Sequence, residues 1–391
     1  MRYNFDKVID RSGTSAEKVE GLKHIWGRTD LIPLWVADMD FATAPFVTDA
    51  IRKRCENEVL GYTGKPDSYY NAIINWVKQR YDLVVVKEMI NFVPGIVPGI
   101  GMAMNCFTQK GDKVMIQPPV YHPFAWVTTR NERTLVTNPL KWENGMYRMD
   151  LDTFREQIKG CKLFILCNPH NPGGVVWTEA ELRAIADICY DEKVLVFSDE
   201  IHADLTLPPH THRPFATVSE KARMNSVTFM SPSKAFNMPG LSASHALIFN
   251  EDLCKRFRIY MDAGELDMGH VFAFLSVEAA YSHGTEWLDQ CLAYIQGNID
   301  FVDDFLKNHA PKIKAIRPEA SYLVWLDCRE LKLSQKDLNE FFVDKAHLAL
   351  NDGEMFGKEG IGFMRLNVAS PRCIIEKAMK QLADAYQLYI K

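Results

Sequence analysis

The stretch Ser226–Lys234 is SVTFMSPSK, in which a lysine follows a short apolar run and is flanked by hydroxyl groups. Apolar runs of this length are typical of buried strands in a mostly parallel sheet. Most lysines extend into solvent, so a lysine at the end of a buried strand is unusual. Partial desolvation lowers the pKa of such an amine, and the amine can form a Schiff base with an aldehyde cofactor. Lys234 is therefore a candidate for cofactor attachment, and the hydroxyls of Ser231 and Ser233 are candidates for binding a phosphate group.

Other segments of the chain show the same strand pattern. They are Lys113–Gln117 (KVMIQ), Lys162–Asn168 (KLFILCN), Lys193–Ser198 (KVLVFS) and His245–Phe249 (HALIF). A helix is predicted between two of them, over Thr178–Asp191, because Thr178 and Glu181 form a capping box and apolar residues line one helix face. Alternating strands and helices predict an α/β fold, with a mostly parallel but mixed sheet flanked by helices.

The pattern changes after residue 284. Apolar residues recur at spacings of three and four from Leu288 to Leu306, which predicts one long amphipathic helix of about six turns. Tyr322–Asp327 (YLVWLD) is a predicted strand, and Pro371–Gln387 is a predicted terminal helix. Such a long helix could connect the α/β domain to a second domain.

The two ends of the chain are expected to form that second domain. Residues 1–50 fit no strand–helix unit and include prolines at positions 33 and 45. We therefore predict an N-terminal arm at 1–50, a large domain at 51–284, and a long helix with a C-terminal region at 285–391. The arm and the C-terminal region together would build a smaller α+β domain.

The composition excludes several classes of protein. The 391 residues carry 45 basic and 50 acidic side chains, and 47% are hydrophobic. This balance indicates a globular protein with no general attraction to nucleic acid or to anionic membranes. Residues 1–11 lack the apolar segment of a signal peptide, and prolines and glycines interrupt the longest uncharged stretch. The nine scattered cysteines form no C-x-x-C pair, which predicts free thiols and a cytoplasmic location.

Polar residues follow two of the predicted strands. Asp199 closes the run Lys193–Ser198, where a carboxylate could pair with a protonated pyridine nitrogen or could simply cap a helix. Asn171 lies in the turn NPHNPGG at 168–174, where its amide could donate to a phenolate oxygen or could belong to an ordinary loop. The histidines of His210-Thr211-His212 are assigned to a surface loop, because prolines surround them and further metal ligands are not suitably spaced. No metal is expected.

Three other positions have a possible binding role. Gly95-Ile96-Val97-Pro98-Gly99 precedes an apolar helical stretch, and free amides at a helix N-terminus bind phosphate. Tyr121, just past the strand Lys113–Gln117, could stack on an aromatic cofactor or belong to the core. Arg365 lies between apolar neighbours and could bind a carboxylate in a bidentate manner or form an ordinary salt bridge.

The order of these features resembles that of the fold-type I pyridoxal phosphate (PLP) enzymes, the aspartate aminotransferase superfamily. The resemblance spans nearly the whole chain and is greatest to the MalY/PatB group of cystathionine β-lyases. The segments that carry it are Trp35–Phe41 (WVADMDF), Gly61–Asp67 (GYTGKPD), Pro118–Pro123, Asn168–Gly174, Ser198–His202 (SDEIH), Ser233–Asn237 (SKAFN) and Arg365–Arg372 (RLNVASPR).

The resemblance implies a role for each matching residue. Lys234 would hold the cofactor aldehyde, Asp199 would pair with the pyridine nitrogen, and Tyr121 would stack on the ring; these three are the expected catalytic residues. Asn171 would donate to the ring oxygen, and His202 would also contribute to the cofactor site. The phosphate would be held by Ile96, Val97, Ser231 and Ser233, and by Tyr62 from a neighbouring subunit. Arg365, with Asn171 and Tyr62, would bind the substrate. A homodimer with shared active sites follows from the role of Tyr62.

The resemblance implies a C–S lyase that cleaves cystathionine or related S-substituted cysteines to pyruvate, ammonia and a thiol. The alternative on the same scaffold is an aminotransferase. The sequence near Lys234 does not separate the two, because both reactions begin with removal of the Cα proton. A regulatory or binding protein built on this fold is a third possibility, and it could coexist with catalysis.

Overall fold

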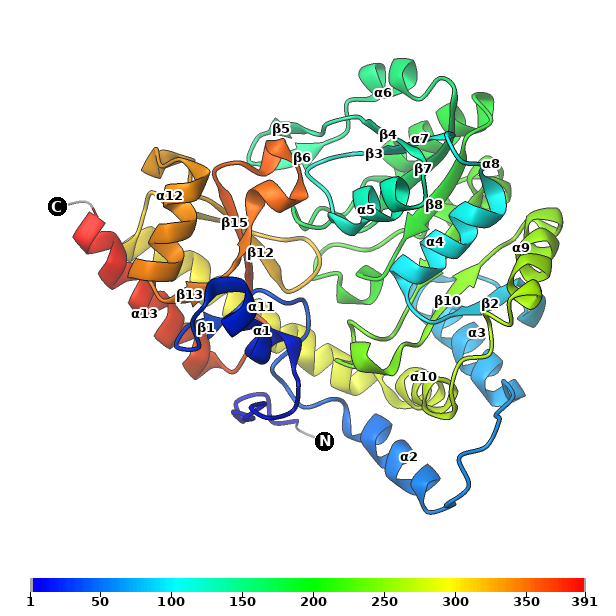
Figure 1. The fold of residues 1–391 in the computed structure, drawn as a ribbon, viewed down its shortest axis with the longest axis horizontal. Coiled ribbons are helices and arrows are strands. Elements are labelled where there is room, and N and C mark those ends of the chain that lie inside the picture. Colours follow the sequence, from blue (N-terminus) through cyan, green and yellow to red (C-terminus); the bar gives the residue numbers. More distant parts are fainter. Residues whose placement is uncertain (1–2, 390–391) are drawn as a thin grey trace.

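The computed structural model describes residues 3–389 and contains a sheet of seven strands (Figure 1). The strand order is β2-β10-β9-β8-β7-β3-β4. Their bounds are Ile90–Val93 (β2), Lys113–Ile116 (β3), Thr134–Thr137 (β4), Cys161–Cys167 (β7), Leu195–Asp199 (β8), Ser226–Met230 (β9) and Ser244–Leu247 (β10). β10 is antiparallel to both neighbours, whereas the other pairs are parallel. The predicted α/β fold with a mixed, mostly parallel sheet is confirmed.

Helices cover both faces of this sheet. On one face, α4 (Ile96–Phe107), α5 (Pro123–Arg130) and α9 (Glu251–Ala263) share a buried apolar cluster with the strands. Another cluster joins the sheet to α6 (Leu151–Gln157), α7 (Glu179–Asp191) and α8 (Glu220–Met224). Neighbouring residues of β7 and β8 alternate between these two clusters, as the period of a strand requires. The capping box predicted at the start of α7 is present.

Three more helices pack beside β2 and β10. They are α2 (Pro45–Cys55), α3 (Asp67–Tyr81) and α10 (Val271–His283). A separate hairpin, β5 (Lys141–Glu143) and β6 (Met146–Arg148), lies outside the main sheet. Both β2 and β10 are buried along their whole length, which matches a sheet covered on both sides.

A second, antiparallel sheet is formed by the C-terminal third of the chain (Figure 1). Its order is β11-β12-β15-β14, with bounds Lys314–Ile316 (β11), Leu323–Asp327 (β12), Asn351–Asp352 (β14) and Phe363–Asn367 (β15). The helices of this region are α11 (Thr285–His309), α12 (Gln335–Glu340) and α13 (Arg372–Tyr389). α11 contains 25 residues, about seven turns, and is therefore longer than the apolar spacing predicts.

The beginning of the chain pairs with this C-terminal region. β1 (Ile32–Pro33) is parallel to β13 (Leu348–Ala349), and α1 (Glu17–Trp26) packs nearby through Leu22. The predicted arm is therefore not free of regular structure, because it contains a helix and a short strand and α2 runs across residue 50. The exact domain boundaries at 1–50, 51–284 and 285–391 stay a prediction.

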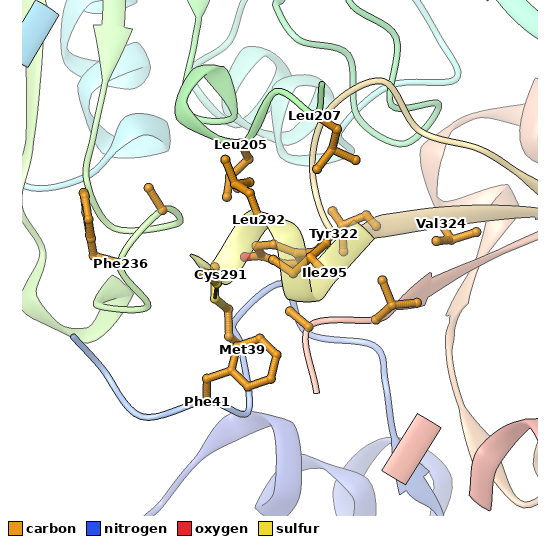
Figure 2. Packing of buried hydrophobic residues seen from close by; sticks show 14 of the residues in the cluster. Met39, Phe41, Leu205, Leu207, Phe236, Cys291, Leu292, Ile295, Tyr322 and Val324 are labelled. Carbon is orange, nitrogen blue, oxygen red and sulfur yellow. Dashed lines mark hydrogen bonds between the residues drawn. The ribbon is translucent and has the colours of Figure 1, made fainter. Parts of the chain in front are cut away.

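One apolar cluster joins these parts of the chain (Figure 2). Met39 and Phe41 from the N-terminal arm pack with Cys291 and Ile295 of α11, and with Tyr322 beside β12. All five side chains are buried. Each fully buried side chain of this kind contributes about 1.5–3 kcal/mol relative to an exposed one, so the arm is held mainly by hydrophobic burial.

Two further observations concern the whole described chain. All nine cysteines are free thiols, as expected. Within residues 3–389, no helix is long and apolar enough to cross a membrane.

Candidate active site

A cavity of about 220 Å³ lies where β7, β8 and β9 end. Ligands of open α/β sheets bind at this edge, outside the carboxyl ends of the strands. The predicted site residues that line the cavity are Ile96, Val97, Tyr121, Asn171, Asp199, His202, Ser233 and Lys234. The fold thus brings together residues that are far apart in the sequence.

Lys234 projects its amine toward the N-terminal arm. Its Nζ donates a hydrogen bond of 2.5 Å to the carbonyl of Ala37, which also accepts a 2.9 Å hydrogen bond from the hydroxyl of Tyr322. Burial lowers the pKa of Lys234 to about 8, although the carboxylates of Asp38 and Asp199 act to raise it. A neutral amine is therefore available near pH 8, which suits a nucleophile or a general base.

Asp199 is the last residue of β8, and only 3% of it is exposed. Its Oδ1 accepts a hydrogen bond from the backbone N–H of Ile201 at 3.1 Å, which is the local capping contact considered from the sequence. Asp199 also lines the cavity, so both interpretations of this residue hold. Burial, aided by the nearby charge of Glu200, raises the pKa of Asp199 to about 7, although the N–H of Ile201 and the charge of Lys234 act to lower it. A carboxylate in this position favours a cationic partner within the cavity.

The opposite end of the cavity suits an anion. α4 begins at Ile96 directly after Gly95, and its first residues line the cavity together with Ser233 and Ser242. The first amides of a helix have no partner within the helix and are available to bind an anion. Gly99 lets this helix approach the sheet, since a Cβ there would lie 2.9 Å from a methyl group of Val93. Backbone amides and hydroxyls, rather than a basic side chain, therefore dominate this end.

Arg365, in β15, reaches the wall of the cavity. Its Nη1 donates to Oδ1 of Asn171 at 3.0 Å, and its Nη2 donates to Oδ1 of Asn351 at 2.5 Å and to the carbonyl of Trp35 at 3.2 Å. Its Nε is buried and has no partner within the described chain. Burial lowers the pKa of Arg365 to about 10, so it stays charged at neutral pH. The guanidinium is thus held in place by three of its five N–H donors, and the Nε–H and the second N–H of Nη1 are left to bind a carboxylate.

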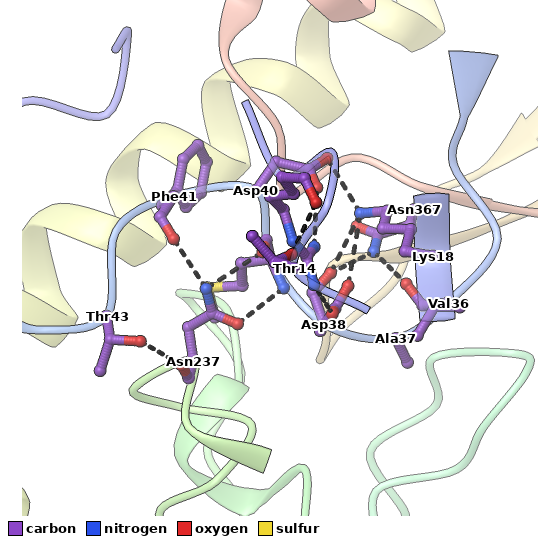
Figure 3. Close-up of polar contacts among 12 residues, drawn as sticks. Thr14, Lys18, Val36, Ala37, Asp38, Asp40, Phe41, Thr43, Asn237 and Asn367 are labelled. Atoms are coloured by element: carbon purple, nitrogen blue, oxygen red, sulfur yellow. Dashed lines mark hydrogen bonds and ion pairs between the residues drawn. The ribbon is translucent and has the colours of Figure 1, made fainter. Parts of the chain in front are cut away.

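The segment 35–41 (WVADMDF) is fixed from several sides (Figure 3). Asn367 donates from Nδ2 to the carbonyls at positions 36 and 38, both at 2.7 Å. Asn237 donates to the carbonyls at 39 and 41 and accepts the N–H of residue 39. The buried Lys18 forms a 2.9 Å ion pair with Asp40. These contacts hold the carbonyl that accepts from Lys234.

Tyr121 and His202 complete the cavity wall. Burial raises the pKa of Tyr121, so its hydroxyl stays protonated at neutral pH. Burial lowers the pKa of His202 to about 3, with the positive charges of Lys234 and Arg365 adding to the effect. His202 is therefore a neutral imidazole, and its Nδ1 has no partner within residues 3–389.

Two of the predicted site residues, Tyr62 and Ser231, do not line the cavity, and the expectation for His212 also differs from the structure. Tyr62 is 98% exposed and does not approach the cavity of its own chain. Ser231 lies behind Ser233, with its hydroxyl within 2.9 Å of the hydroxyl of Ser233 and 2.8 Å of the carbonyl of Ala243, so it orients that region instead of lining the cavity. The interpretation of His212 as part of a surface loop is wrong, because His212 is buried and lies 2.7 Å from Oε2 of Glu200.

Other contributors were not predicted from the sequence. The carbonyls of Trp35 and Ala37 belong to the WVADMDF segment, whose unusual sequence was the available signal. Asn351 holds Arg365 but lies in a short strand without a distinctive pattern. Ser242 and Ser244 also line the cavity.

Comparison with known proteins agrees with this site. The family model for class I and II aminotransferases matches residues 29–382. The cystathionine β-lyase PatB of Bacillus subtilis is 38% identical, with 98% of this chain and 99% of PatB covered. The protein MalY of Escherichia coli is 30% identical, with 98% of each chain covered. Cystalysin from Treponema denticola, whose crystal structure contains pyridoxal 5'-phosphate, superposes with a TM-score of 0.96 at 33% identity over the whole of both chains.

The chain belongs to the class I and II aminotransferase family, whose fold-type I architecture its two sheets and cavity share. Within that family it is similar along its whole length to cystathionine β-lyases such as PatB.

Proposed function

We propose that the protein is a PLP-dependent C–S β-lyase that cleaves cystathionine or a related S-substituted cysteine. The products would be pyruvate, ammonia and a thiol, which is homocysteine when cystathionine is the substrate. The observation that carries the proposal is that Lys234, Asp199 and Asn171 line one cavity, with Arg365 hydrogen-bonded to Asn171. The likeness to PatB and cystalysin supports both the reaction and the cofactor.

The residues present fit PLP. The buried carboxylate of Asp199 would pair with the pyridine nitrogen, and Lys234 would be joined to the aldehyde. Because Oδ1 of Asn171 accepts from Arg365, the Nδ2 of Asn171 is left to donate to the ring oxygen. The neutral His202 would contribute beside it, and Tyr121 would stack on the ring.

The phosphate would lie at the start of α4. The amides of Ile96 and Val97 and the hydroxyl of Ser233 would bind it, with Ser231 orienting Ser233 from behind. Tyr62 would add a hydroxyl from the neighbouring subunit, and we therefore also propose a homodimer. The free cysteines support a cytoplasmic location.

Bound PLP would supply an electron sink for the negative charge that develops at the substrate Cα. The chain's own residues would do the rest. Arg365 binds the substrate carboxylate, which fixes the direction of the Cα–H bond. Lys234, once its amine is free, takes the Cα proton on Nζ as the general base. Asp199 keeps the pyridine nitrogen protonated by holding a negative charge against it.

Elimination then breaks the bond between Cβ and sulfur. The sulfur leaves with the bonding electron pair and is protonated to the thiol. Water hydrolyses the remaining three-carbon fragment to pyruvate and ammonia. In sum, one substrate and one water give one thiol, one pyruvate and one ammonia, with no change in oxidation state that would require another reactant.

An aminotransferase is the second candidate, because the matching family model describes aminotransferases. One experiment separates the two functions. The purified protein is incubated with cystathionine, cystine, cysteine and S-alkyl-cysteines without added keto acid, and pyruvate and thiol are measured. We expect one thiol per pyruvate from cystathionine and the S-alkyl-cysteines, hydrogen sulfide in place of the thiol from cysteine, and a persulfide from cystine. Faster transamination of sulfur-free amino acids, measured in a parallel assay with an added keto acid as amino acceptor, together with little pyruvate from any thioether, would instead assign an aminotransferase.

A further inference from the structure

Two acidic side chains just behind the cavity have no part in the proposed chemistry. Glu200 and Asp204 belong to the segment 199–204 (DEIHAD), and both are buried. The cavity is lined by Asp199 and His202 of the same segment, but not by these two carboxylates. A buried carboxylate is costly unless hydrogen bonds or a charge partner satisfy it. The hydrogen-bond partners of Glu200 and Asp204 therefore show which parts of the chain the two carboxylates connect.

Glu200 has three hydrogen-bond partners. The hydroxyl of Ser198 donates to Oε1 at 2.8 Å, and the N–H of Phe215 donates to the same oxygen at 2.9 Å. The Nε2 of His212 lies 2.7 Å from Oε2. The side chains of Glu200 and His212 are 0% and 1% exposed, so both are removed from solvent. Glu200 thus ties the end of β8 to the loop 212–215.

These contacts lie behind Asp199. Neighbouring side chains of an extended strand point to opposite faces, so Ser198 and Glu200 share one face and Asp199 points to the other. The backbone on either side is also held, because the N–H of Glu200 donates to the carbonyl of Phe229 and the carbonyl of Asp199 accepts from the N–H of Asn168, both at 2.9 Å. The Glu200 side chain thus adds to the contacts that fix the backbone on which the Asp199 carboxylate is carried.

Asp204 anchors the other end of the segment. The indole Nε1 of Trp76 lies 3.0 and 3.2 Å from its two carboxylate oxygens, and the hydroxyl of Tyr81 donates to Oδ1. The ring of Tyr81 also packs edge-on against His212 at 5.5 Å, so the two anchors adjoin. Between them, the chain presents His202 to the cavity.

We propose that Glu200, held by His212, is a positioning residue that acts through Asp199 and sets its carboxylate against the cofactor ring nitrogen. The inference rests on the proposed PLP-dependent function. The proposal gives His212, in the His210-Thr211-His212 motif, a role other than metal binding. Its hydrogen bond to Glu200 accounts for the burial of the imidazole. The proposal also explains why a carboxylate rather than an apolar side chain follows Asp199.

A double-mutant cycle on PLP affinity tests the proposal. PLP is removed from wild type, Glu200→Gln, Asp199→Asn and the double variant, and the dissociation constant for added PLP is measured by absorbance. Glu200→Gln is expected to weaken PLP about tenfold, the order seen when a side chain that orients a functional group is lost. If Glu200 acts through Asp199, the double variant should bind within about twofold of Asp199→Asn alone. The circular dichroism of the bound cofactor reports the orientation of its ring, and this signal should change in the Glu200→Gln protein.

The outcomes separate this inference from the proposed function. Additive losses in the cycle, or an unchanged affinity and dichroism in Glu200→Gln, would overturn the positioning role. Failure of the wild type itself to bind PLP would instead overturn the proposed function. Glu376→Gln, which neutralises an exposed carboxylate on α13, is the matched control and should bind PLP as wild type does. If Glu200→Gln does not fold, the cycle is run with Ser198→Ala, which removes one of the three bonds; the same non-additivity is expected, and additivity would reject the proposal.

Discussion

Asp199 and Lys234 face one cavity with pKa values displaced in opposite directions. Burial raises the pKa of the Asp199 carboxyl to about 7 and lowers that of the Lys234 amine to about 8. In both cases the neutral form is favoured, because the charged form loses its hydration. Opposed shifts of this kind are typical of catalytic sites, where groups are kept ready for proton transfer or for a charged ligand.

The raised pKa of Asp199 predicts a stability cost in the PLP-free protein. The folded state holds this proton up to about pH 7, whereas the unfolded chain releases it near pH 3.8, so stability is lost as pH rises between these values. Asp199→Asn keeps the acceptor for the N–H of Ile201 but has no charge to bury. We expect the PLP-free variant to be more stable than wild type at pH 8, by on the order of 4 kcal/mol at most, and the difference to vanish near pH 4.

Urea unfolding of both PLP-free proteins at several pH values measures this difference. Added PLP should reduce the difference in unfolding free energy between the two proteins at pH 8, because the pyridinium would neutralise the carboxylate of the wild type. An Asp199→Asn protein that is less stable than wild type at pH 8 would show that the carboxylate already has a favourable partner.

Replacement of Lys234 tests its role as cofactor anchor and base. Lys234→Ala should lower turnover of cystathionine by roughly 10²–10⁴-fold or more, since the nucleophile and the general base are both lost. Borohydride treatment of the wild type should fix PLP to Lys234, which peptide mass spectrometry would identify. Substantial turnover by Lys234→Ala, or a label on another lysine, would contradict the assignment.

Arg365 should act through the substrate carboxylate. Arg365→Ala is expected to lower kcat/KM for cystathionine by roughly a hundredfold, because the substrate is no longer oriented. Arg365→Lys keeps a charge but not the planar fork held by Asn171 and Asn351, so it should recover only part of the loss. Steady-state kinetics of the three proteins, with the carboxamide of the substrate as a control, would measure the effect. Equal losses for acid and amide would exclude a carboxylate contact.

The chemistry-bearing residues at strand ends were predictable from the sequence, but their supports were not. Lys234 and Asp199 each follow an apolar run, and in an α/β fold the carboxyl ends of such strands lie at one edge of the sheet. Asn351 and His212 have no such signal, because each acts through a partner distant in the sequence. Prolines around His212 indicated a loop, but they could not show that Glu200 draws it into the interior.

At the scale of elements, the strongest patterns gave the correct strands and the weakest were missed. β7, β8 and β9 are nearly continuous apolar runs, as buried parallel strands require. β4 is an edge strand with two of its four residues exposed, so its sequence lacks that signal. β2 has only four residues and no turn residues mark its start, which explains why it was not predicted as a strand.

The segment 35–41 should depend strongly on Asn367. This buried side chain donates to two carbonyls of the segment and accepts the N–H of Ala369. Asn367→Ala would therefore remove the partners of the Val36 carbonyl and the Ala369 N–H, and would leave the Asp38 carbonyl with Lys18 alone. We expect a loss of about 1–3 kcal/mol in the free energy of unfolding, since buried polar groups would be unsatisfied. Urea unfolding measures it. Asn308→Ala, which removes one exposed hydrogen bond within α11, is the control and should change stability by less than about 0.5 kcal/mol. Equal losses in the two variants would show that the segment is not held by Asn367.

At the scale of the whole molecule, the N-terminal arm is part of the active site. The carbonyls of residues 35 and 37 accept hydrogen bonds from Arg365, within β15 of the second sheet, and from Lys234, in the loop after β9 of the main sheet. β1 and the apolar cluster around Met39 attach the same arm to the C-terminal region. The composition of residues 1–50 could indicate an arm, but only the long-range pairing shows that it links the two parts of the molecule at the cavity.

The segment around Tyr62, in contrast to the buried apolar cluster around Met39, is exposed to solvent. Val59, Leu60 and Tyr62 are 72%, 59% and 98% exposed, which is unusual for three apolar or aromatic side chains so close together. Exposed apolar residues that gather in this way mark interaction surfaces. A second copy of the chain would cover them, and it would bring the hydroxyl of Tyr62 to another cavity. This is the physical basis for the proposed homodimer.

Mixing two inactive variants tests whether each site is built from both subunits. Tyr62→Ala and Lys234→Ala proteins are unfolded together, refolded, and assayed for pyruvate release. If Tyr62 serves the partner's cavity, a hybrid dimer has one site with both residues intact, so random pairing should restore about a quarter of wild-type activity. If Tyr62 serves its own chain, every site lacks one residue and the mixture stays as inactive as its components. Refolding each variant alone is the control, and sedimentation analysis of the mixture should show dimers. Restored activity requires a Lys234 from one chain beside a Tyr62 from the other, which no arrangement within a single chain can supply.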